Sequence, residues 1–220
     1  MLTLLSGLIA LASAGSGWAQ EGSVAAGVAA ETAGPQEVDA VLARARGLLE
    51  EARRARAAQD LAGVQAKVST AIGALLEDPG GDGAGDRVAL LRQLAALARD
   101  AGDLHAAERA CARVHEVLSA ERPESDAELQ AARQDLAVVL LSLGDLQAAR
   151  KLFEQVLEAY EETLPDEHVE LQKARLNLAG ALKMLGDLQG AKALEEQSLE
   201  VLLRTVPEND LGLQTVRGNL

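Results

Sequence analysis

The chain repeats itself at a fixed spacing, and this period constrains its fold more than any other feature. Prolines, a Leu-Gln pair, an arginine and a Gly-Asp-Leu turn all recur at one interval, the step from Pro123 to Pro165. The recurring positions are Pro123, Pro165 and Pro207; Leu129-Gln130, Leu171-Gln172 and Leu213-Gln214; Arg133, Arg175 and Arg217; and Gly102, Gly144 and Gly186. Units 123–164 and 165–206 agree at about half of their positions. A fixed period of this length is typical of repeat proteins built from one supersecondary unit.

Each unit predicts two helices joined by a tight turn. Pro165 is followed by acidic residues, which is typical of a helix start, because proline tolerates the first turn and carboxylates favour the positive end of the helix dipole. Gly186 is expected to end the first helix in the left-handed conformation, and Asp187 to cap the second. One such hairpin cannot bury its own apolar faces. The sequence therefore predicts an all-α stack of antiparallel helix hairpins.

The units resemble tetratricopeptide repeats of the 42-residue kind found in kinesin light chains. The resemblance is carried by Asn177-Leu178-Ala179, Gly186-Asp187 and Ala191 in one unit, and by Leu136-Ala137, Gly144-Asp145, Ala149 and Phe153 in the preceding one. It covers about residues 86–220 and implies a right-handed superhelical α-solenoid. There are two departures from the family pattern. Leu140 and Leu182 replace a tyrosine of the first helix, and the position of Phe153 holds Cys111 and Glu195 in the neighbouring units. A glutamate there predicts looser packing or an exposed edge.

The period also predicts how the chain is divided. Full repeats are expected over 81–122, 123–164 and 165–206, followed by a partial fourth repeat over 207–220. Residues 37–80 are expected to form a degenerate helical hairpin that caps the array at its N-terminal end, with a flexible loop over 78–86.

The last segment restarts the repeat and stops inside its first helix. A terminal helix can serve as a natural cap. Its apolar residues Leu211, Leu213, Val216 and Leu220 spread round the helix, however, and are not expected to face the preceding repeat together. We therefore expect the array to be truncated here.

Residues 1–19 are a candidate signal peptide. The apolar run 2–14 is too short to span a bilayer, which takes about 20 residues, and small-x-small cleavage patterns follow it. No Lys or Arg precedes the run, which departs from the usual signal. We expect export to the periplasm or the extracellular space, no integral membrane segment after cleavage, and a flexible spacer over 20–36. If the segment is uncleaved or the start codon is misassigned, the chain is expected to be cytoplasmic.

Composition argues against several classes of function. The net charge of −13 disfavours nucleic acid as a partner, because phosphate binding needs clustered Lys and Arg. The arginines of 44–56 could form an anionic-partner patch, but they alternate with Glu50 and Glu51 and are more typical of a solvated face. The single cysteine and three isolated histidines show no metal-ligand spacing, and no nucleotide-binding or nucleophile motif is present. We expect no metal, no cofactor and no catalytic residue, so the chain is not expected to be an enzyme.

The resemblance also implies where a partner would bind. In tetratricopeptide repeats the first helices line a concave groove, and an asparagine just before Leu-Ala contacts a bound peptide. That position holds Gln93, Asp135, Asn177 and Asn219 here, and with Gln134 and Lys173 these residues form the candidate partner groove. The alternative is that they are only the soluble surface of a scaffold whose partner binds elsewhere.

The sequence thus predicts a protein–protein interaction scaffold that binds a peptide or protein partner in the groove. The alternative function is the non-catalytic interaction arm of a larger protease or kinase whose catalytic domain would lie beyond residue 220. The identity of the partner and the oligomeric state are not predicted.

Overall fold

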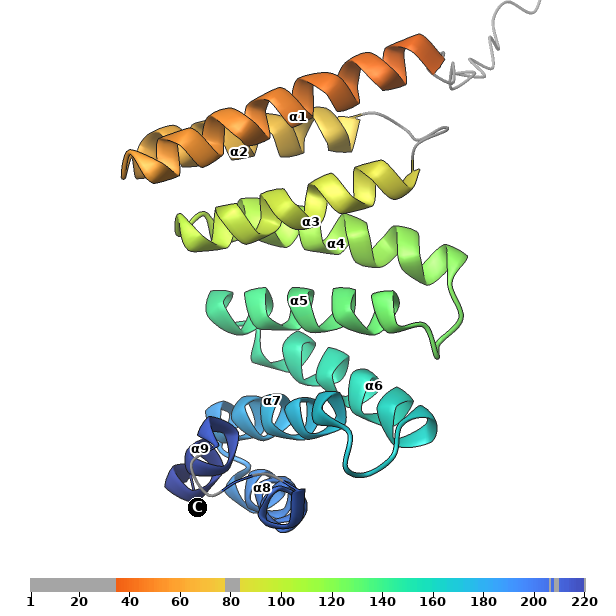
Figure 1. The fold of residues 1–220 in the computed structure, drawn as a ribbon, viewed down its shortest axis with the longest axis vertical. Helices are drawn as coiled ribbons and strands as arrows, with labels where there is room; N and C mark the ends of the chain where they lie inside the picture. Colours follow the sequence, from red (N-terminus) through yellow and green to blue (C-terminus); the bar gives the residue numbers. More distant parts are fainter. Residues whose placement is uncertain (1–34, 78–83, 206, 208–209, 220) are drawn as a thin grey trace, which may run out of the picture. The chain divides into compact units, whose positions relative to one another are not determined.

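The computed structural model describes residues 35–77, 84–205, 207 and 210–219, and the regular structure of these residues is entirely α-helical (Figure 1). The helices described are Pro35–Ala57 (α1), Leu61–Glu77 (α2), Ala84–Asp100 (α3), Leu104–Glu121 (α4), Ala127–Leu143 (α5), Leu146–Thr163 (α6), Val169–Leu185 (α7), Leu188–Thr205 (α8) and Leu211–Asn219 (α9). Each helix packs against its neighbours in chain order. The predicted α-solenoid of stacked helix hairpins is confirmed.

The turns inside the hairpins have the predicted chemistry. Gly144 and Gly186 end α5 and α7 with φ of 88° and 86°, a conformation that other residues rarely adopt. The next residue then caps the following helix: Oδ1 of Asp145 accepts from the backbone N–H of Ala148 at 3.1 Å, and Asp187 repeats this at Gly190. In the N-terminal hairpin Gln59 takes the positive φ instead, and Asp60 caps α2.

The prolines do not open the helices, so that prediction is wrong. Pro123 and Pro165 lie three residues before the N-cap residues of α5 and α7, which are Asp126 and His168. The proline carbonyls accept from the backbone N–H groups of these N-cap residues at 2.9 Å. The prolines therefore stabilise the turn between hairpins, and the side chains of Asp126 and His168 cap the N-termini of α5 and α7.

The arginine and the glutamine that recur with the repeat period form hydrogen bonds that stabilise the same turns, those before α5 and α7. The guanidinium of Arg133 donates to both carboxylate oxygens of Glu124, and in the next repeat Nη1 of Arg175 donates to Asp166 at 2.7 Å. Gln130 and Gln172 donate to the backbone carbonyls of the same two acids. These four donor side chains are buried, which explains why polar residues recur inside an apolar stripe.

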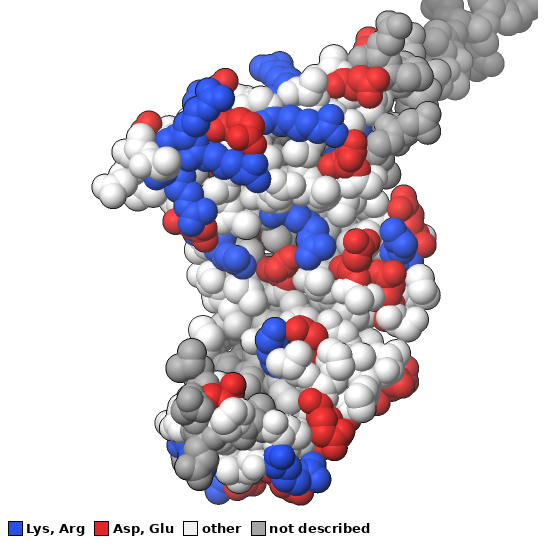
Figure 2. Space-filling model, viewed as in Figure 1, with Lys and Arg blue, Asp and Glu red and all other residues white. Residues whose placement is uncertain are grey.

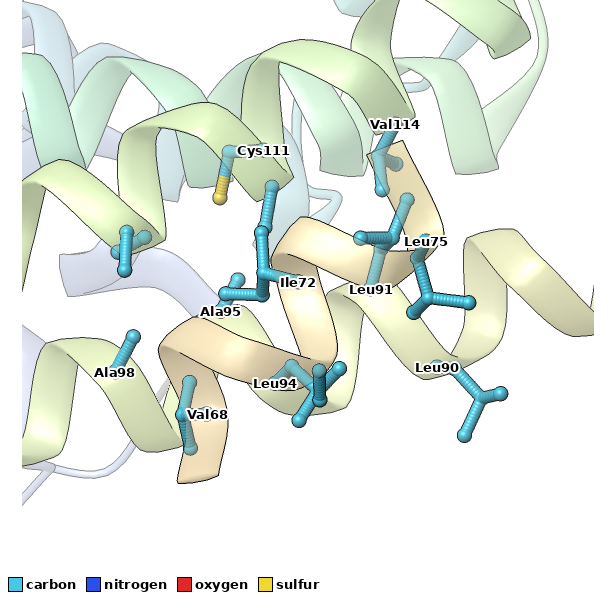
Figure 3. Packing of buried hydrophobic residues seen from close by; sticks show 14 of the residues in the cluster. Val68, Ile72, Leu75, Leu90, Leu91, Leu94, Ala95, Ala98, Cys111 and Val114 are labelled. Carbon is cyan, nitrogen blue, oxygen red and sulfur yellow. The ribbon is translucent and has the colours of Figure 1, made fainter. Parts of the chain in front are cut away.

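Aliphatic side chains fill the space between the helices. In Figure 3, Val68, Ile72 and Leu75 of α2, Leu91 and Leu94 of α3, and Val114 of α4 belong to one buried cluster. A second cluster around Phe153 joins α5 to α8, with Ala149 and Ala191 at 0% exposure. The fully buried alanines mark where helix backbones approach each other closely.

Glu195 does not form the exposed edge that was predicted from its replacement of phenylalanine. It is 2% exposed, and its carboxylate lies 2.8 Å from Nζ of Lys183. The lysine neutralises the buried charge, so the packing at this position is preserved by an ion pair.

The ends of the predicted segments need correction in two places. Helix α1 already begins at Pro35, inside the predicted spacer, and α3 begins at Ala84, inside the predicted loop. The candidate signal peptide, 1–19, lies outside the described residues, and export stays a prediction. Leu213 and Val216 are both buried against α8, while the side chains of Leu211 and Leu220 are not described.

Candidate partner groove

Two of the candidate residues, Gln134 and Asn177, contact each other across α5 and α7. Nδ2 of Asn177 donates to Oε1 of Gln134 at 3.4 Å, and Nε2 of Gln134 donates to the hydroxyl of Tyr160 at 3.2 Å. Both amide side chains are half-buried. An amide has two donor hydrogens and two acceptor lone pairs, so each keeps capacity for a further partner.

Two more candidates are held by arginines that lie outside the predicted groove residues. Arg92 lies 3.5 Å from the carboxylate of Asp135, in the same relative register as the contact of Gln134 with Asn177. Arg53 of α1 donates to Oε1 of Gln93 at 2.6 Å. Side-chain contacts therefore connect α1 to α3, α3 to α5 and α5 to α7. They form one row of contacts that runs across the first helices of successive repeats.

The remaining two candidates are not part of this row of contacts. Nζ of Lys173 pairs with Glu170 on its own helix at 2.8 Å, and the lysine is exposed. Asn219 is the last residue of α9, and its side chain lies outside the described residues.

The surface along α3 is hollowed on both of its sides. A hollow of about 280 Å³ is lined by Arg53, Arg56, Gln93, Ala96 and Leu97. A smaller hollow of about 30 Å³ is lined by Arg92, Ala95, Ala96, Arg99, Cys111, Asp135 and Val139. Ala96 lines both hollows, so they adjoin at its side chain. Arg92 could have been found from the sequence, because it occupies the position of Gln134 in the preceding repeat.

Charge is distributed unevenly along the chain. Residues 35–101 hold nine Lys and Arg against ten Asp and Glu, whereas residues 102–220 hold twelve against twenty-two. In Figure 2, Lys and Arg gather on the part of the surface where α1 and α3 lie in Figure 1. The large negative charge therefore resides mainly in the second half of the chain, and the arginines that line the hollows along α3 belong to the nearly balanced half.

Burial shifts the pKa of two side chains of α4, Cys111 beside the smaller hollow and His115. Burial, followed by the charge of Asp135, raises the pKa of the Cys111 thiol to about 11, so the reactive thiolate is scarce. Burial lowers the pKa of His115, and the Arg133 guanidinium lowers it further. In the described part of the chain no group of three or more His, Cys, Asp or Glu residues is placed to hold a metal ion.

A third hollow, of about 320 Å³, lies beside α6 and the turn before α5. Three of its lining residues are acidic: Glu124, Glu158 and Glu162. Glu124 is already paired with Arg133, which holds the pKa of the glutamate below its ordinary value.

None of the described helices combines the length and apolar character needed to cross a lipid bilayer.

Comparison with known proteins places these features in a family. The family model of the tetratricopeptide repeat matches residues 86–162 and 128–204, whereas no curated protein matches the chain. The TPR-like repeats of a Podosopora anserina putative kinesin light chain superpose with a TM-score of 0.66 at 21% identity, covering 81% of this chain and 84% of that one. BtubC from P. vanneervenii superposes with a TM-score of 0.61 at 16% identity, covering 83% and 81% of the two chains. The apo form of RapI gives 0.57 at 12% identity over 84% of this chain and 53% of its own. At such identities the likeness to these structures shows the fold alone.

Proposed function

Because the chain belongs to the tetratricopeptide-repeat family, we propose that it is a protein-interaction scaffold that binds an extended segment of a partner along α3, α5 and α7. The observation that carries this proposal is the row of polar side chains at one register position. Gln93, Asp135 and Asn177 occupy the same place in successive repeats, and Gln134 joins the last two helices.

The chemistry of the row suits a peptide backbone. Peptide groups present an N–H donor and a C=O acceptor in alternation, and a side-chain amide can satisfy both. Asn177 uses one N–H on Gln134, which leaves its oxygen and its second N–H for a ligand. Gln134 is oriented by Tyr160, whose ring is buried and whose hydroxyl accepts the amide N–H. Gln134 and Asn177 are therefore held in contact in the absence of a partner.

The residues beside these positions on the helix surface are uncharged. Residues 96, 138 and 180 lie three positions further along their helices and are Ala, Val and Gly. Residues three apart are neighbours on a helix surface. The small residues Ala96 and Gly180 let an extended chain approach the helices closely, and Val138 offers it a partly buried apolar surface between them.

A peptide array tests the proposed function. The full chain would be incubated with an array of short random peptides, and the selected peptides would then be titrated against variants by fluorescence anisotropy. Asn177→Ala is expected to weaken binding about three- to tenfold, as loss of a partner-facing hydrogen bond does. Lys192→Ala serves as the matched control, because Lys192 is an exposed residue of α8 outside the row. Failure to select any peptide, or equal loss in both variants, would contradict the proposal.

A further inference from the structure

One position on the second helix of each repeat carries a different residue in every repeat. Its side chain packs beneath the surface of the first helix of that repeat. The position holds Cys111, Phe153 and Glu195 in successive repeats. The residue opposite on the first helix changes with it: Leu141 belongs to the cluster around Phe153, and Lys183 pairs with Glu195. Opposite Cys111 stands Arg99, and here the structure has the hollow of about 30 Å³.

The hollow thus exists where a small side chain replaces a large one. Phe153 is 1% exposed and fills this place in the second repeat, whereas the Cys111 side chain lacks a ring and leaves the space open. A water molecule needs roughly 10–15 Å³ of such volume, so the hollow is large enough for a small group of a ligand. Its floor is apolar, with Ala95, Cys111 and Val139, and its rim is charged.

The rim carries arginine side chains, and the described fold leaves the donors of one of them, Arg99, unused. Arg99 is exposed and makes no hydrogen bond or ion pair within the described residues. Arg92 has Asp135 at 3.5 Å, which is longer than the usual charge-assisted hydrogen bond of about 2.7–2.9 Å. Across Ala96, the larger hollow adds Arg53 and Arg56, which pair with Glu50 and Asp100 but remain about half exposed. Four arginines and Asp135 therefore line the two adjoining hollows, and Glu50 and Asp100 pair with two of these arginines.

We propose that the repeat at 81–122 anchors the partner, and that it does so by binding an acidic segment of the partner peptide. An Asp or Glu carboxylate of the peptide lies between Arg92 and Arg99 above Cys111, and neighbouring acidic residues of the peptide face Arg53 and Arg56. Asp135 limits the affinity, because its carboxylate competes for Arg92. The inference rests on the proposed function, since it assigns a ligand chemistry to one end of the same surface.

Three substitutions test the anchor in different directions. Arg99→Gln removes a donor from the rim, and binding of an acidic peptide is expected to weaken about three- to tenfold. Asp135→Asn removes the competing carboxylate, and the same peptide is expected to bind about two- to fivefold more tightly. Cys111→Phe places in the first repeat the residue that the second repeat carries, closes the hollow, and is expected to weaken binding at least about tenfold.

Control variants distinguish an effect of the two hollows from a general effect of charge or of misfolding. Arg150→Gln and Glu154→Gln alter an exposed ion pair on α6, which lines neither hollow, and are expected to leave binding unchanged. Cys111→Val preserves most of the space and tests whether the thiol itself matters. If Cys111→Phe fails to fold by circular dichroism, the exposed variants Arg99→Gln and Asp135→Asn still decide the question.

The probe is the same random-peptide array, read at low and at physiological salt. Selected peptides enriched in Asp and Glu, with opposite effects of Arg99→Gln and Asp135→Asn, would support the anchor. Selected peptides without that enrichment, or peptides whose affinity neither substitution changes, would overturn the anchor and leave the scaffold function standing. Selection of no peptide would overturn both.

Discussion

The carboxylate of Glu195 lies 2.8 Å from Nζ of Lys183 and is almost completely buried, at a position where the preceding repeat carries Phe153. A buried charge that loses its partner is costly, whereas a well-packed apolar pair is often at least as stable as the ion pair. We expect Lys183→Leu alone to lower the free energy of unfolding by about 3 kcal/mol, because Glu195 stays buried without its partner while the lysine itself is partly exposed. The double variant Lys183→Leu/Glu195→Phe reproduces the Leu141 and Phe153 pair and is expected to recover most of that loss.

A double-mutant cycle by chemical denaturation measures this coupling. The exposed pair Lys192 and Glu196 on the same helix is the control, and its removal is expected to change stability by no more than about 0.5 kcal/mol. Additive effects of the Lys183 and Glu195 substitutions would mean that the two side chains do not stabilise each other.

The turn between hairpins supplies the second prediction. Arg175 is nearly buried and donates to Asp166 at 2.7 Å, which fixes the turn against the start of α7. Replacing it by methionine keeps the apolar stem but removes the donors, and we expect a loss of about 1–2 kcal/mol. Arg204 approaches the same Asp166 at 3.8 Å from an exposed position, so Arg204→Gln is the control and should cost less than about 0.5 kcal/mol. Equal melting temperatures for the two variants would contradict a role of Arg175 in fixing the turn.

His115 gives the third prediction, which concerns pH. Its pKa lies below the ordinary value because of burial and of the nearby Arg133 guanidinium, with Glu124 acting in the opposite direction. The unfolded chain therefore binds this proton more readily than the folded chain. Stability is expected to be full above the unfolded pKa of about 6.5 and to fall as pH drops through it towards the lower folded pKa.

Thermal unfolding between about pH 7.5 and 5 measures this effect. His115→Gln should flatten the dependence on pH, whereas His105→Gln should not, because His105 is exposed at the start of α4. A profile that His115→Gln leaves unchanged would show that another group is responsible.

The sequence predicted the parts of the fold that depend on local chemistry. A glycine at a helix C-terminus and an aspartate one residue later define a turn by backbone conformation and by one hydrogen bond, so Gly144-Asp145 and Gly186-Asp187 could be placed from their spacing. The proline was misassigned because its usual place in the first helical turn was assumed. The competing role, accepting a hydrogen bond from the N-cap residue three positions later, depends on the conformation of the turn.

The candidate site was predicted less completely than the fold. Gln134 and Asn177 were named and do meet, because neighbouring register positions of successive repeats lie on facing helices. The arginines at 92 and 99 were not named, because their significance depends on the space beside Cys111, which arises only when helices from two repeats are packed together. Glu195 was misjudged for the same reason: its partner Lys183 lies on another helix, α7, and meets it only when the hairpin is folded.

The fourth prediction concerns the reactivity of Cys111. The thiol is 6% exposed and its pKa is raised to about 11, so only about one molecule in a thousand is thiolate at pH 8. Labelling by a thiol-specific disulfide reagent is expected to be at least about a hundred times slower in the native protein than in denaturant, and to accelerate with rising pH. Absorbance of the released thiol measures the rate. Rapid labelling of the native protein would show that α3 and α4 separate readily.

The fifth prediction uses the alanines that recur in the second helix of each repeat. Ala107, Ala149 and Ala191 each have 0% exposure, in α4, α6 and α8 respectively. Tryptophan at such a position forces the facing helix backbone away, and overpacking of a dense core costs about 1–3 kcal/mol or more. Gln147→Trp adds the same ring at an exposed position of α6 and is the matched control.

Tryptophan at Ala149 and at Ala191 is not expected to lower the melting temperature equally, because the stability of a stacked array is approximately a sum over repeats and the interfaces between them. Ala149 lies in a repeat that packs against a neighbour on each side, so Ala149→Trp strains two interfaces. Ala191 lies in α8, whose only described neighbour further along the chain is the short helix α9. We therefore expect the melting temperature to fall more for Ala149→Trp than for Ala191→Trp, with no change for Gln147→Trp. Equal melting temperatures for Ala149→Trp and Gln147→Trp would contradict the close packing assigned to this position.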